Sequence, residues 1–487
     1  MGLANPQALI STLTAYNGEQ EWFEFKKDNV SPDDIGEYIS ALANSAMLEN
    51  KAKAYLLFGI RDADHAVIGT TVRLENEKIG NEHLINWLHK MLTPSIHLEF
   101  SHCEVDGKRV EIIEIGPTYD RPVLFKNVEY IRVQSSKRRL KDYPAKERTL
   151  WHLTSRFAFE SGLAASNYSR DQIFSEFYCH ELAKAIYSSH PMSDINVLES
   201  LLSDGLVIDN LQGGYDITNL FVVAAARDLS RFRTVSHKSP RVIIYKGTNK
   251  LVGLDDVTGR YGYIVSFPRI LRFIGEKVSG KEIFLHGVRK REKFYPEIAI
   301  RELVANSLIH QDFIDTGPGP TVEIYDDRIE ITNVGESLLD PIRMIDAPPK
   351  SRNERLAGLM RAARFCEARG SGVDRACWAI EQAMQAPPMF QVVEGSTIVT
   401  MYKHTDFGSM TKEERVRACY QHSVLSHLNG APMTNGTLRK RLGLNHNQSP
   451  AATNVINDTI AAGLIRPLDE DQGKKFAKYL PIWAKTT

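Results

Sequence analysis

The sequence lacks the marks of an exported, disulfide-bonded or membrane-spanning protein. It contains no uncharged apolar run of about 18 residues, and no basic segment followed by an apolar one near its start. Its five cysteines include no CxxC pair and their number is odd, so neither a disulfide framework nor a zinc site is indicated. We therefore expect a cytoplasmic protein in a reducing compartment.

An excess of one charge is also missing, because 60 lysines and arginines balance 60 aspartates and glutamates. A nucleic-acid site must therefore come from local basic clusters, which also occur as ordinary solvated surfaces. One cluster comprises Arg132, Lys137, Arg138, Arg139, Lys141, Lys146 and Arg148. A second comprises Arg289, Lys290, Arg291 and Lys293. The absence of a GxxxxGK[ST] motif disfavours a P-loop motor.

Helix and strand patterns are mixed along a chain too long for one ordinary core. The pattern predicts an α+β multi-domain protein with parts at residues 1–143, 144–285, 286–407 and 413–487. Strands are expected in EWFEFK, AYLLFGI, PRVIIYKG and YGYIVSF, and hairpins at Asp106-Gly107 and Asn127. Helices are expected over residues 32–49 and 297–312, and between 352 and 386.

Glu24 and Lys26 form an E-x-K triplet on a predicted strand, with Glu19 upstream and Asp62 after the next strand. Carboxylates from neighbouring elements hold Mg²⁺ or Mn²⁺ in phosphodiester hydrolysis, and a lysine orients water or neutralises phosphate charge. An exposed strand also carries such a triplet by chance. Spacing alone therefore leaves a catalytic and a structural interpretation open.

Four blocks between Glu19 and Ser136 resemble the Schlafen AlbA-type domain: EQEWFEFK, DIGEYISALANS, YLLFGIRDADHAVIG and RPVLFKNVEYIRVQSS. In its nuclease members a carboxylate triad cleaves RNA, notably transfer RNA. The resemblance assigns metal and catalysis to Glu19, Glu24 and Asp62, with Lys26 beside the scissile phosphate and Asp64 as a rival for the third acid. The chain departs from the family at SAMLENK, where members carry a glycine pair. Other relatives are DNA-binding regulators, so both activities remain open.

A second polar set lies on the predicted helix IAIRELVANSLIHQD. Glu302, Asn306 and His310 follow at intervals of four and share one face. A glutamate can polarise water, and an asparagine can ligate Mg²⁺ on nucleotide phosphates, although a merely polar helix face has the same pattern. Glycine turns follow at Gly335 and at residues 370–372, where backbone amides can approach an anion.

This order of helix, hairpin and two glycine turns, from Glu297 to His404, resembles the GHKL ATPase module. The resemblance implies an ATP site with Mg²⁺ on Asn306. It assigns cofactor binding to Glu302, Asn306, Gly335, Gly370, Ser371 and Gly372. NVGES stands where the family carries an adenine-reading aspartate, which leaves that residue open. ATP binding is therefore favoured over fast turnover.

Residues 413–487 have the order of a winged helix, with three helices and a strand pair that turns near Gly473. Side chains able to reach base edges are Thr453, Asn454 and Asn457, and those able to reach phosphates are Lys474, Lys475 and Lys478. Winged helices also serve as protein-interaction or dimerisation modules, which stays an alternative.

Together these patterns predict an ATP-controlled, metal-dependent nuclease acting on RNA or DNA as a homo-oligomer. The expected cofactors are Mg²⁺ or Mn²⁺ and ATP. By analogy, such an assembly suits anti-phage defence. The alternatives are a non-catalytic, nucleotide-responsive DNA-binding transcriptional regulator and a scaffold whose glycine turns are structural.

Overall fold

The computed structural model describes most of the chain. The described residues are 5–16, 18–28, 31–49, 51–116, 121–155, 159–187, 190–285, 288–348, 350–367, 371–403, 406–469, 473 and 477–484. The chain forms two compact units, one of Met1–Arg170 with Leu201–Thr218 and one of Asp171–Ser200 with Asn219–Thr487. Both contain helices and sheets, which confirms the α+β class. The division into four domains stays a prediction.

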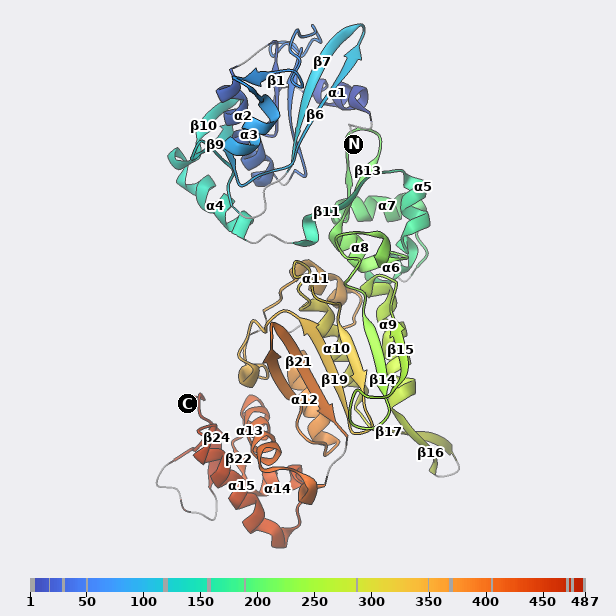
Figure 1. Ribbon diagram of the computed structural model, residues 1–487. Helices are drawn as coiled ribbons and strands as arrows, with labels where there is room; N and C mark the ends of the chain where they lie inside the picture. The colour runs from blue at the N-terminus through green and yellow to red at the C-terminus, as the bar shows by residue number, and fades with distance from the viewer. Residues whose placement is uncertain are drawn as a thin grey trace. The chain divides into compact units, whose positions relative to one another are not determined.

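The first unit contains a sheet of order β1-β2-β7-β6 (Figure 1). Its strands are Phe23–Lys26, Ala54–Phe58, Lys108–Ile115 and Leu98–Val105. Helix α2 (Pro32–Leu48) begins after Ser31, whose hydroxyl accepts from a backbone N–H of the first turn. The apolar residues of α2 recur at helical spacing, so one face is buried: Ile35, Ile39, Leu42 and Ala46.

A second sheet in this unit has the order β10-β9-β8-β5. Its strands are Ser136–Arg139, Val128–Val133, Leu124–Phe125 and Leu92–Thr93. The turns at Asp106-Gly107 and Lys126-Asn127 have positive φ at both residues, which confirms both predicted hairpins. Asn44 of α2 donates to Val123 O at 2.9 Å and to Tyr130 O at 2.8 Å. These bonds hold β9 against the helix.

The remaining elements of this unit are short. They are α1 (Pro6–Thr14), β3 (Lys78–Ile79), β4 (Glu82–His83), α3 (Leu84–Met91) and α4 (Pro144–Ser155), with a sheet of order β11-β13-β12 from Leu163–Tyr168, Tyr215–Thr218 and Val207–Asp209. Between β11 and β12 the chain forms α5 (Arg170–Glu176), α6 (Cys179–Ile186) and α7 (Asp194–Ser203). Helix α8 (Asn219–Ala225) follows β13.

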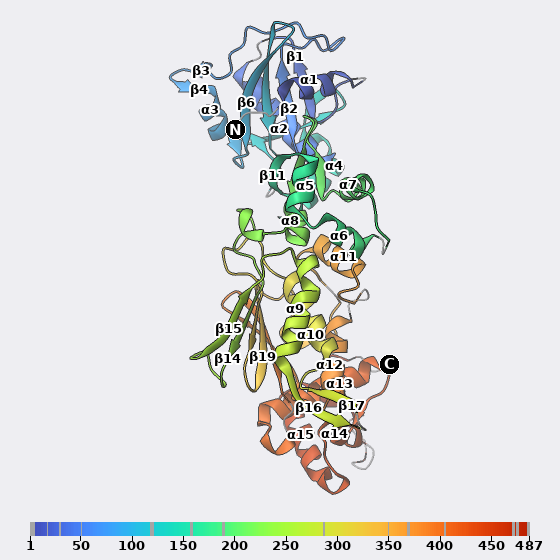
Figure 2. The same cartoon turned by 90° about the vertical axis from the view of Figure 1, so that its right-hand side faces the viewer.

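The second unit is built on a six-stranded sheet of order β15-β14-β18-β19-β21-β20. Its strands are Gly253–Thr258, Arg241–Tyr245, Thr321–Ile324, Arg328–Val334, Ser396–Tyr402 and Met389–Val393. Figure 2 shows the helices α9 (Tyr263–Val278), α10 (Glu297–Ile309) and α12 (Gly372–Gln382) on one side of this sheet. Helix α11 covers Glu354–Ala362, and β16 (Ser279–Leu285) pairs with β17 (Val288–Lys293).

The strand predicted in YGYIVSF is wrong, because Tyr263 begins α9. The aromatic and β-branched residues favour a strand locally. Yet Tyr263, Ile264 and Phe267 are buried at helical spacing against neighbouring helices, and this packing decides the structure.

The C-terminal part contains α13 (Lys412–Leu428), α14 (Asn435–Arg441) and α15 (Ser449–Ala461), with a sheet of order β22-β24-β23 from Met433–Thr434, Lys478–Pro481 and Ile465–Pro467. The three helices and the strand pair β23-β24 lie where the sequence predicts them, β22 was not predicted, and the winged-helix assignment stays a prediction. Lys474 and Lys475 lie outside the described residues. Across the described ranges, no helix combines the length and apolar character needed to cross a membrane.

Candidate nucleotide pocket and nucleic-acid interface

A pocket in the second unit is lined by α10 and by strands β19 and β21. Glu302, Asn306 and His310, which the sequence predicts on one helix face, all line it. Asn333 and Thr397 contribute from the two strands. The loop after β19 and the start of α12 supply further lining residues. The pocket thus combines helix, sheet and glycine-turn elements that are far apart in the sequence.

Glu302 is buried, and both of its carboxylate oxygens have partners. Oε1 accepts from Arg301 Nη2 at 2.6 Å, and Oε2 accepts from the Glu367 N–H at 3.3 Å. Gly372 is so close that an added Cβ would lie 2.8 Å from Oε2. Gly372 therefore brings the start of α12 close against the Glu302 carboxylate. Ser371 occupies the N-cap of α12 without a side-chain capping bond, and Gly370 lies outside the described residues.

Three polar side chains of the lining, Asn306, Lys350 and Arg361, have no ion pair or side-chain hydrogen bond among the described residues. Lys350 and Arg361 are also exposed. Unpaired cations suit nucleotide phosphates, and an amide oxygen suits Mg²⁺ bound to them. The donor set of this pocket therefore fits a Mg–nucleotide.

Asn333 and Thr397 lie opposite each other in the register of β19 and β21. The Asn333 amide nitrogen donates to His310 O at 3.3 Å and to Val334 O at 3.2 Å. Thr397 Oγ1 donates to Gly335 O at 2.8 Å. These bonds leave the Asn333 amide oxygen as an acceptor, which suits the exocyclic amine of a nucleobase.

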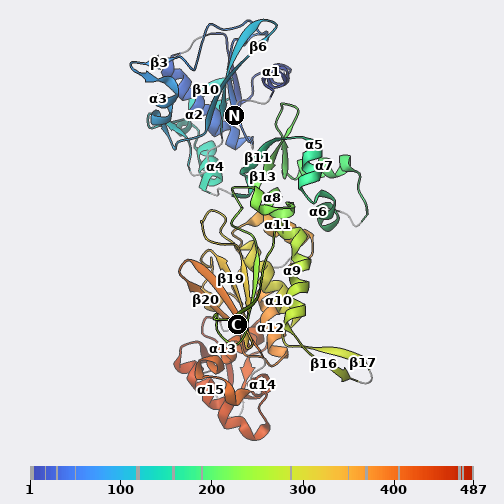
Figure 3. The same ribbon diagram turned by 45° about the vertical axis from the view of Figure 1, so that its right-hand side comes forward.

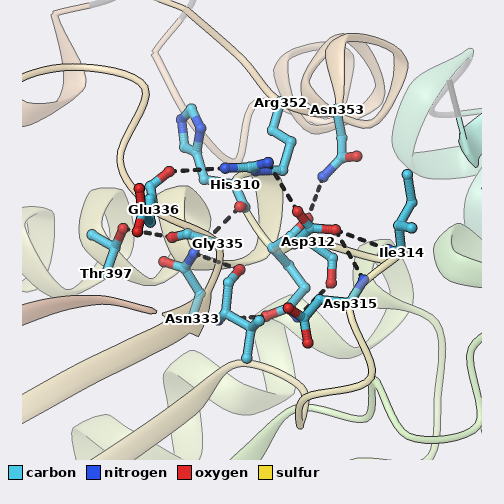
Figure 4. Close-up of polar contacts among 12 residues, drawn as sticks. His310, Asp312, Ile314, Asp315, Asn333, Gly335, Glu336, Arg352, Asn353 and Thr397 are labelled. Carbon is cyan, nitrogen blue, oxygen red and sulfur yellow. Dashed lines mark hydrogen bonds and ion pairs between the residues drawn. The ribbon is translucent and has the colours of Figure 1, made fainter. Parts of the chain in front are cut away.

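Arg352 organises the backbone beside this pocket (Figure 4). Its Nη1 donates to Asp312 Oδ2 at 2.9 Å, and its Nη2 donates to Glu336 O at 2.8 Å. Gly335 has φ +113°, and a Cβ there would lie 3.1 Å from Arg352 Nε. The Gly335 N–H donates to Gly395 O at 2.8 Å. This amide is therefore not available to an anion, and the glycine makes room for Arg352.

Burial, and to a smaller extent the positive charge of Arg352, lowers the pKa of His310 to about 4. The imidazole is therefore neutral at physiological pH. A neutral ring adds no positive charge to the pocket, which leaves Lys350 and Arg361 as its unpaired cations among the described residues.

The loop of residues 336–348 contacts both the pocket and the C-terminal helices. Leu339 and Met344 line the pocket. Tyr420 Oη of α13 donates to Ile342 O at 3.2 Å, and the Arg343 guanidinium lies 4.5 Å from the Trp483 ring centroid. A change in this loop on ligand binding would therefore reach the C-terminal module.

In the first unit, two of the three acids predicted to bind metal, Glu19 and Glu24, lie around a fully buried arginine. Arg132 Nη2 donates to Glu19 Oε2 at 2.9 Å, and Arg132 Nη1 contacts Glu24 Oε2. Glu19 Oε1 also accepts from the Phe25 N–H at 2.6 Å. Burial raises the pKa of Glu19, while the Phe25 N–H and Arg132 lower it. The carboxylate pair is thus neutralised from within the protein.

The two other predicted residues are arranged differently. Lys26 pairs with Glu24 and lies 4.5 Å above the Tyr38 ring, so it is held against the acid cluster. The charge of Asp62 raises the pKa of Glu19, whereas Asp64 pairs with Arg61 at 2.8 Å. Of the two aspartates, Asp62 is therefore the one whose charge acts on Glu19.

These residues do not fit a metal ion as they stand. Within the part of the chain that the structure describes, no group of three or more His, Cys, Asp or Glu is arranged to hold one. The physical reason at the predicted triad is Arg132, whose guanidinium contacts both Glu19 and Glu24.

The first basic cluster divides into ion-paired members and exposed members. Besides Arg132, Lys137 pairs with Asp34 and Glu37, and Lys146 pairs with Glu21 at 2.7 Å. The exposed members are Arg138, Arg139, Lys141 and Arg148. Side chains of the second cluster, on β17, lie outside the described residues.

Two regions of the chain match known families. Residues 19–141 match the model described as Schlafen, AlbA_2, and residues 317–401 match the model described as putative ATP-dependent DNA helicase recG C-terminal. The chain therefore combines a Schlafen AlbA_2 domain with a recG-like C-terminal ATPase domain, which indicates a nucleic-acid-related, ATP-associated function. The Schlafen part of the sequence resemblance is confirmed.

Two solved structures are similar to the chain, one over nearly its whole length and one over a part of it. One is a protein from Corynebacterium diphtheriae, with 17% identity over 97% of this chain and 96% of that chain and a TM-score of 0.43. The other is the N-terminal domain of a putative ATP-dependent DNA helicase RecG-related protein from Nitrosomonas europaea. It has 21% identity over 28% of this chain and 93% of that chain, and a TM-score of 0.20. Both scores are too low to define a shared fold. No curated protein matches the chain.

Proposed function

We propose that the protein binds Mg–ATP in the pocket of the second unit and that the nucleotide controls its binding to nucleic acid. The observation that carries the nucleotide assignment is the set of unpaired donors Asn306, Lys350 and Arg361 in one pocket. Asn306 would hold the metal, and the two cations would hold the phosphates. The match of residues 317–401 to an ATP-dependent helicase region supports the same assignment.

At the other end of the ligand, Asn333 and Thr397 are the candidates for contact with the base. Their amide oxygen and hydroxyl lie side by side in the register of two strands. The free Asn333 amide oxygen suits the exocyclic amine of adenine, whereas the Thr397 hydroxyl already donates to Gly335 O and would pack beside the base. Guanine lacks that amine at the same position. We therefore expect ATP to bind more tightly than GTP.

Slow turnover is part of the proposal. A general base must accept a proton from water, and both Glu302 oxygens already accept from Arg301 and from Glu367 N–H. Glu302 therefore supports the shape of the pocket in the described state. Binding of ATP without rapid hydrolysis suits a control role better than a motor role.

Nucleic acid would bind to the first unit through Arg138, Arg139, Lys141 and Arg148. These exposed cations are on or just after β10 and on α4, and they remain when the ion-paired members of the cluster are set aside. Contacts to phosphates are independent of sequence and weaken with salt. In the C-terminal part, proposed as a winged helix, Asn454 and Asn457 are exposed on α15 and suit base edges.

The geometry favours a non-catalytic, nucleotide-responsive regulator as the first candidate. Its basis is Arg132, because carboxylates neutralised by a buried guanidinium are poor ligands for a second cation. A metal-dependent nuclease at Glu19, Glu24 and Asp62 is the second candidate, supported by the electrostatic contact of Asp62 with Glu19. A homo-oligomer and an anti-phage role stay predictions from the sequence.

One experiment separates the two candidates. The purified protein is incubated with RNA, transfer RNA and duplex DNA, with and without Mn²⁺ and ATP, and binding and cleavage are followed together. A regulator changes its affinity with ATP and leaves every substrate intact. Cleavage that needs Mn²⁺ and disappears in Glu24→Ala would establish the nuclease instead.

A further inference from the structure

Two tyrosines and three arginines gather on the second unit where three helices meet. Tyr178 precedes α6, Arg227 follows α8, and Arg260 and Tyr261 precede α9, which carries Arg269. Helices α6, α8 and α9 are in mutual contact, as Figure 3 shows. We call these five residues the arginine–tyrosine surface. It lies outside both regions that match known families.

Backbone hydrogen bonds fix the segments that carry this surface. The Tyr178 N–H donates to Ala225 O at 2.8 Å, and the Gly262 N–H donates to Ala226 O at 2.8 Å. A Cβ at Gly262 would lie 2.3 Å from Ala225 N, so only glycine permits this approach. The surface is therefore preformed, and a ligand would not need to order it.

Two of the three arginines of this surface lie on the tyrosine rings. The Arg227 guanidinium is 4.1 Å from the Tyr178 ring centroid, and that of Arg269 is 4.8 Å from the Tyr261 centroid. The two rings pack edge to face at 5.4 Å. Contact with a ring holds a guanidinium plane in place while its N–H groups stay accessible.

Within the part of the chain that the structure describes, the three arginines of this surface are not held in ion pairs, although the pKa of nearby Asp228 is lowered by a hydrogen bond from Ser230 and in part by the charge of Arg260. Among the described residues, Arg227, Arg260 and Arg269 form no ion pair and no side-chain hydrogen bond, and all three are exposed. Arg231 on the same segment differs, because it pairs with Glu176 at 3.2 Å. Three unpaired arginines in one small area indicate that an external anion supplies the counter-charge.

A polar recess adjoins one of these arginines, Arg260. Arg260 belongs to its lining together with Asp228, whose carboxylate is held by Ser230 at 2.6 Å and 3.0 Å. The other lining side chains include Ser236, His237, Ser239, Arg241 and Thr258. Arg241 is paired with Asp256. Hydroxyls and an imidazole beside an unpaired arginine suit a phosphodiester, which accepts hydrogen bonds at several oxygens.

Aromatic rings combined with unpaired arginines are what single-stranded nucleic acid requires. Unpaired bases stack on aromatic rings or on guanidinium planes, and the phosphates bind the cations. A duplex hides its base faces and cannot stack in this way. Protein partners with acidic surfaces would use the arginines and leave the tyrosines without a role.

We infer that the arginine–tyrosine surface is a binding site for single-stranded nucleic acid, with bases stacked at Tyr178 and Tyr261 and phosphates at Arg227, Arg260 and Arg269. The site is independent of the cations proposed for the first unit and of the nucleotide pocket. Its success or failure therefore does not depend on the proposed function.

The test uses the full chain and labelled oligo(dT), oligo(U) and duplex DNA, with affinity followed by fluorescence anisotropy. Replacing Tyr178 and Tyr261 together by Ala should weaken binding of both single strands about 5- to 150-fold, the loss that corresponds to about 1–3 kcal/mol of stacking. The Phe double variant should bind like the wild type. Duplex binding should change little, and an unchanged circular dichroism spectrum and melting temperature serve as the control for folding.

A second measurement examines the charges. Each of Arg227→Gln and Arg269→Gln should lower the salt dependence of single-strand binding by about 0.7 in log–log slope. Arg231→Gln is the matched control, because that exposed arginine is already ion-paired. It should leave the slope unchanged.

Crosslinking decides between this surface and others on the same chain. Oligonucleotides carrying 5-iodouridine, irradiated on the wild-type protein, should form adducts at Tyr178 or Tyr261. The inference is overturned if adducts form only elsewhere, or if the Ala double variant weakens duplex and single strands equally.

Discussion

The buried guanidinium of Arg132 donates to the carboxylate of Glu19 at 2.9 Å. This contact changes the role that can be assigned to Glu19 and Glu24. They are the acids expected to hold a metal, and an internal cation occupies the space between Glu19 and Glu24. Arg132 was expected in a nucleic-acid-binding cluster, but it is buried and pairs with these carboxylates instead.

Removing Arg132 should be severe for the first unit. Arg132→Ala removes the cation that pairs with buried Glu19 and leaves Glu24 with Lys26 alone, so the free energy of unfolding should fall by about 3–5 kcal/mol. Arg138→Ala, an exposed member of the same cluster, should change it by less than about 0.5 kcal/mol. Urea denaturation followed by circular dichroism measures both. Equal small losses would mean that Arg132 is not a buried counter-ion.

The glycine beside Glu302 provides a test of the pocket geometry. Gly372→Ala places a methyl group 2.8 Å from Glu302 Oε2, which must displace the carboxylate or the start of α12. Affinity for Mg–ATP should fall at least about tenfold. Gly358→Ala in α11 is the control, because a Cβ there meets nothing within 4 Å and alanine favours the helix. An unchanged affinity for Mg–ATP in Gly372→Ala would show that this turn does not take part in nucleotide binding.

His310 predicts a pH dependence of stability. Its folded pKa of about 4 lies below the unfolded value of about 6.5, so the folded state binds fewer protons than the unfolded state. The stabilising difference is complete above pH 6.5 and is lost as pH falls toward 4, by at most about 3 kcal/mol. His310→Gln should therefore lose less stability than the wild type over this range. Melting temperature is measured at each pH for both proteins. If it falls by the same amount with pH in both, His310 is not the group responsible.

The loop of residues 336–348 should transmit nucleotide binding to the C-terminal part. Because it lines the pocket and also bonds to Tyr420, Mg–ATP should slow hydrogen exchange in this loop and in α13. Tyr420→Phe removes the bond to Ile342 O and should reduce the effect in α13 only. Slower exchange confined to the pocket would show that nucleotide binding does not affect the C-terminal part.

The sequence predicted the pocket in part, for identifiable physical reasons. The spacing of Glu302 and Asn306 follows from the helical period, so their shared face was predictable. Lys350 and Arg361 were missed, because the course of a loop and the direction of a surface arginine depend on tertiary packing. Gly335 was found as a turn glycine, but its amide bonds to Gly395 O, which no local pattern indicates.

The first unit shows the same limit. Strands, hairpins and the helix at residues 32–48 follow local rules and were predicted. The burial of Arg132 was not, although an arginine inside the apolar strand segment YIRV was a signal that could have suggested it. Whether such an arginine contacts phosphate or carboxylate depends on which acids the fold brings to it.

The central claim is that the pocket binds a Mg–nucleotide, and calorimetric titration of the full chain with Mg–ATP tests it most directly. The account predicts saturable binding by the wild type, and at least about tenfold weaker binding by Asn306→Ala, which loses the metal ligand. Unchanged affinity in Asn306→Ala, or no binding of ATP or ADP at any Mg²⁺ concentration, would contradict it.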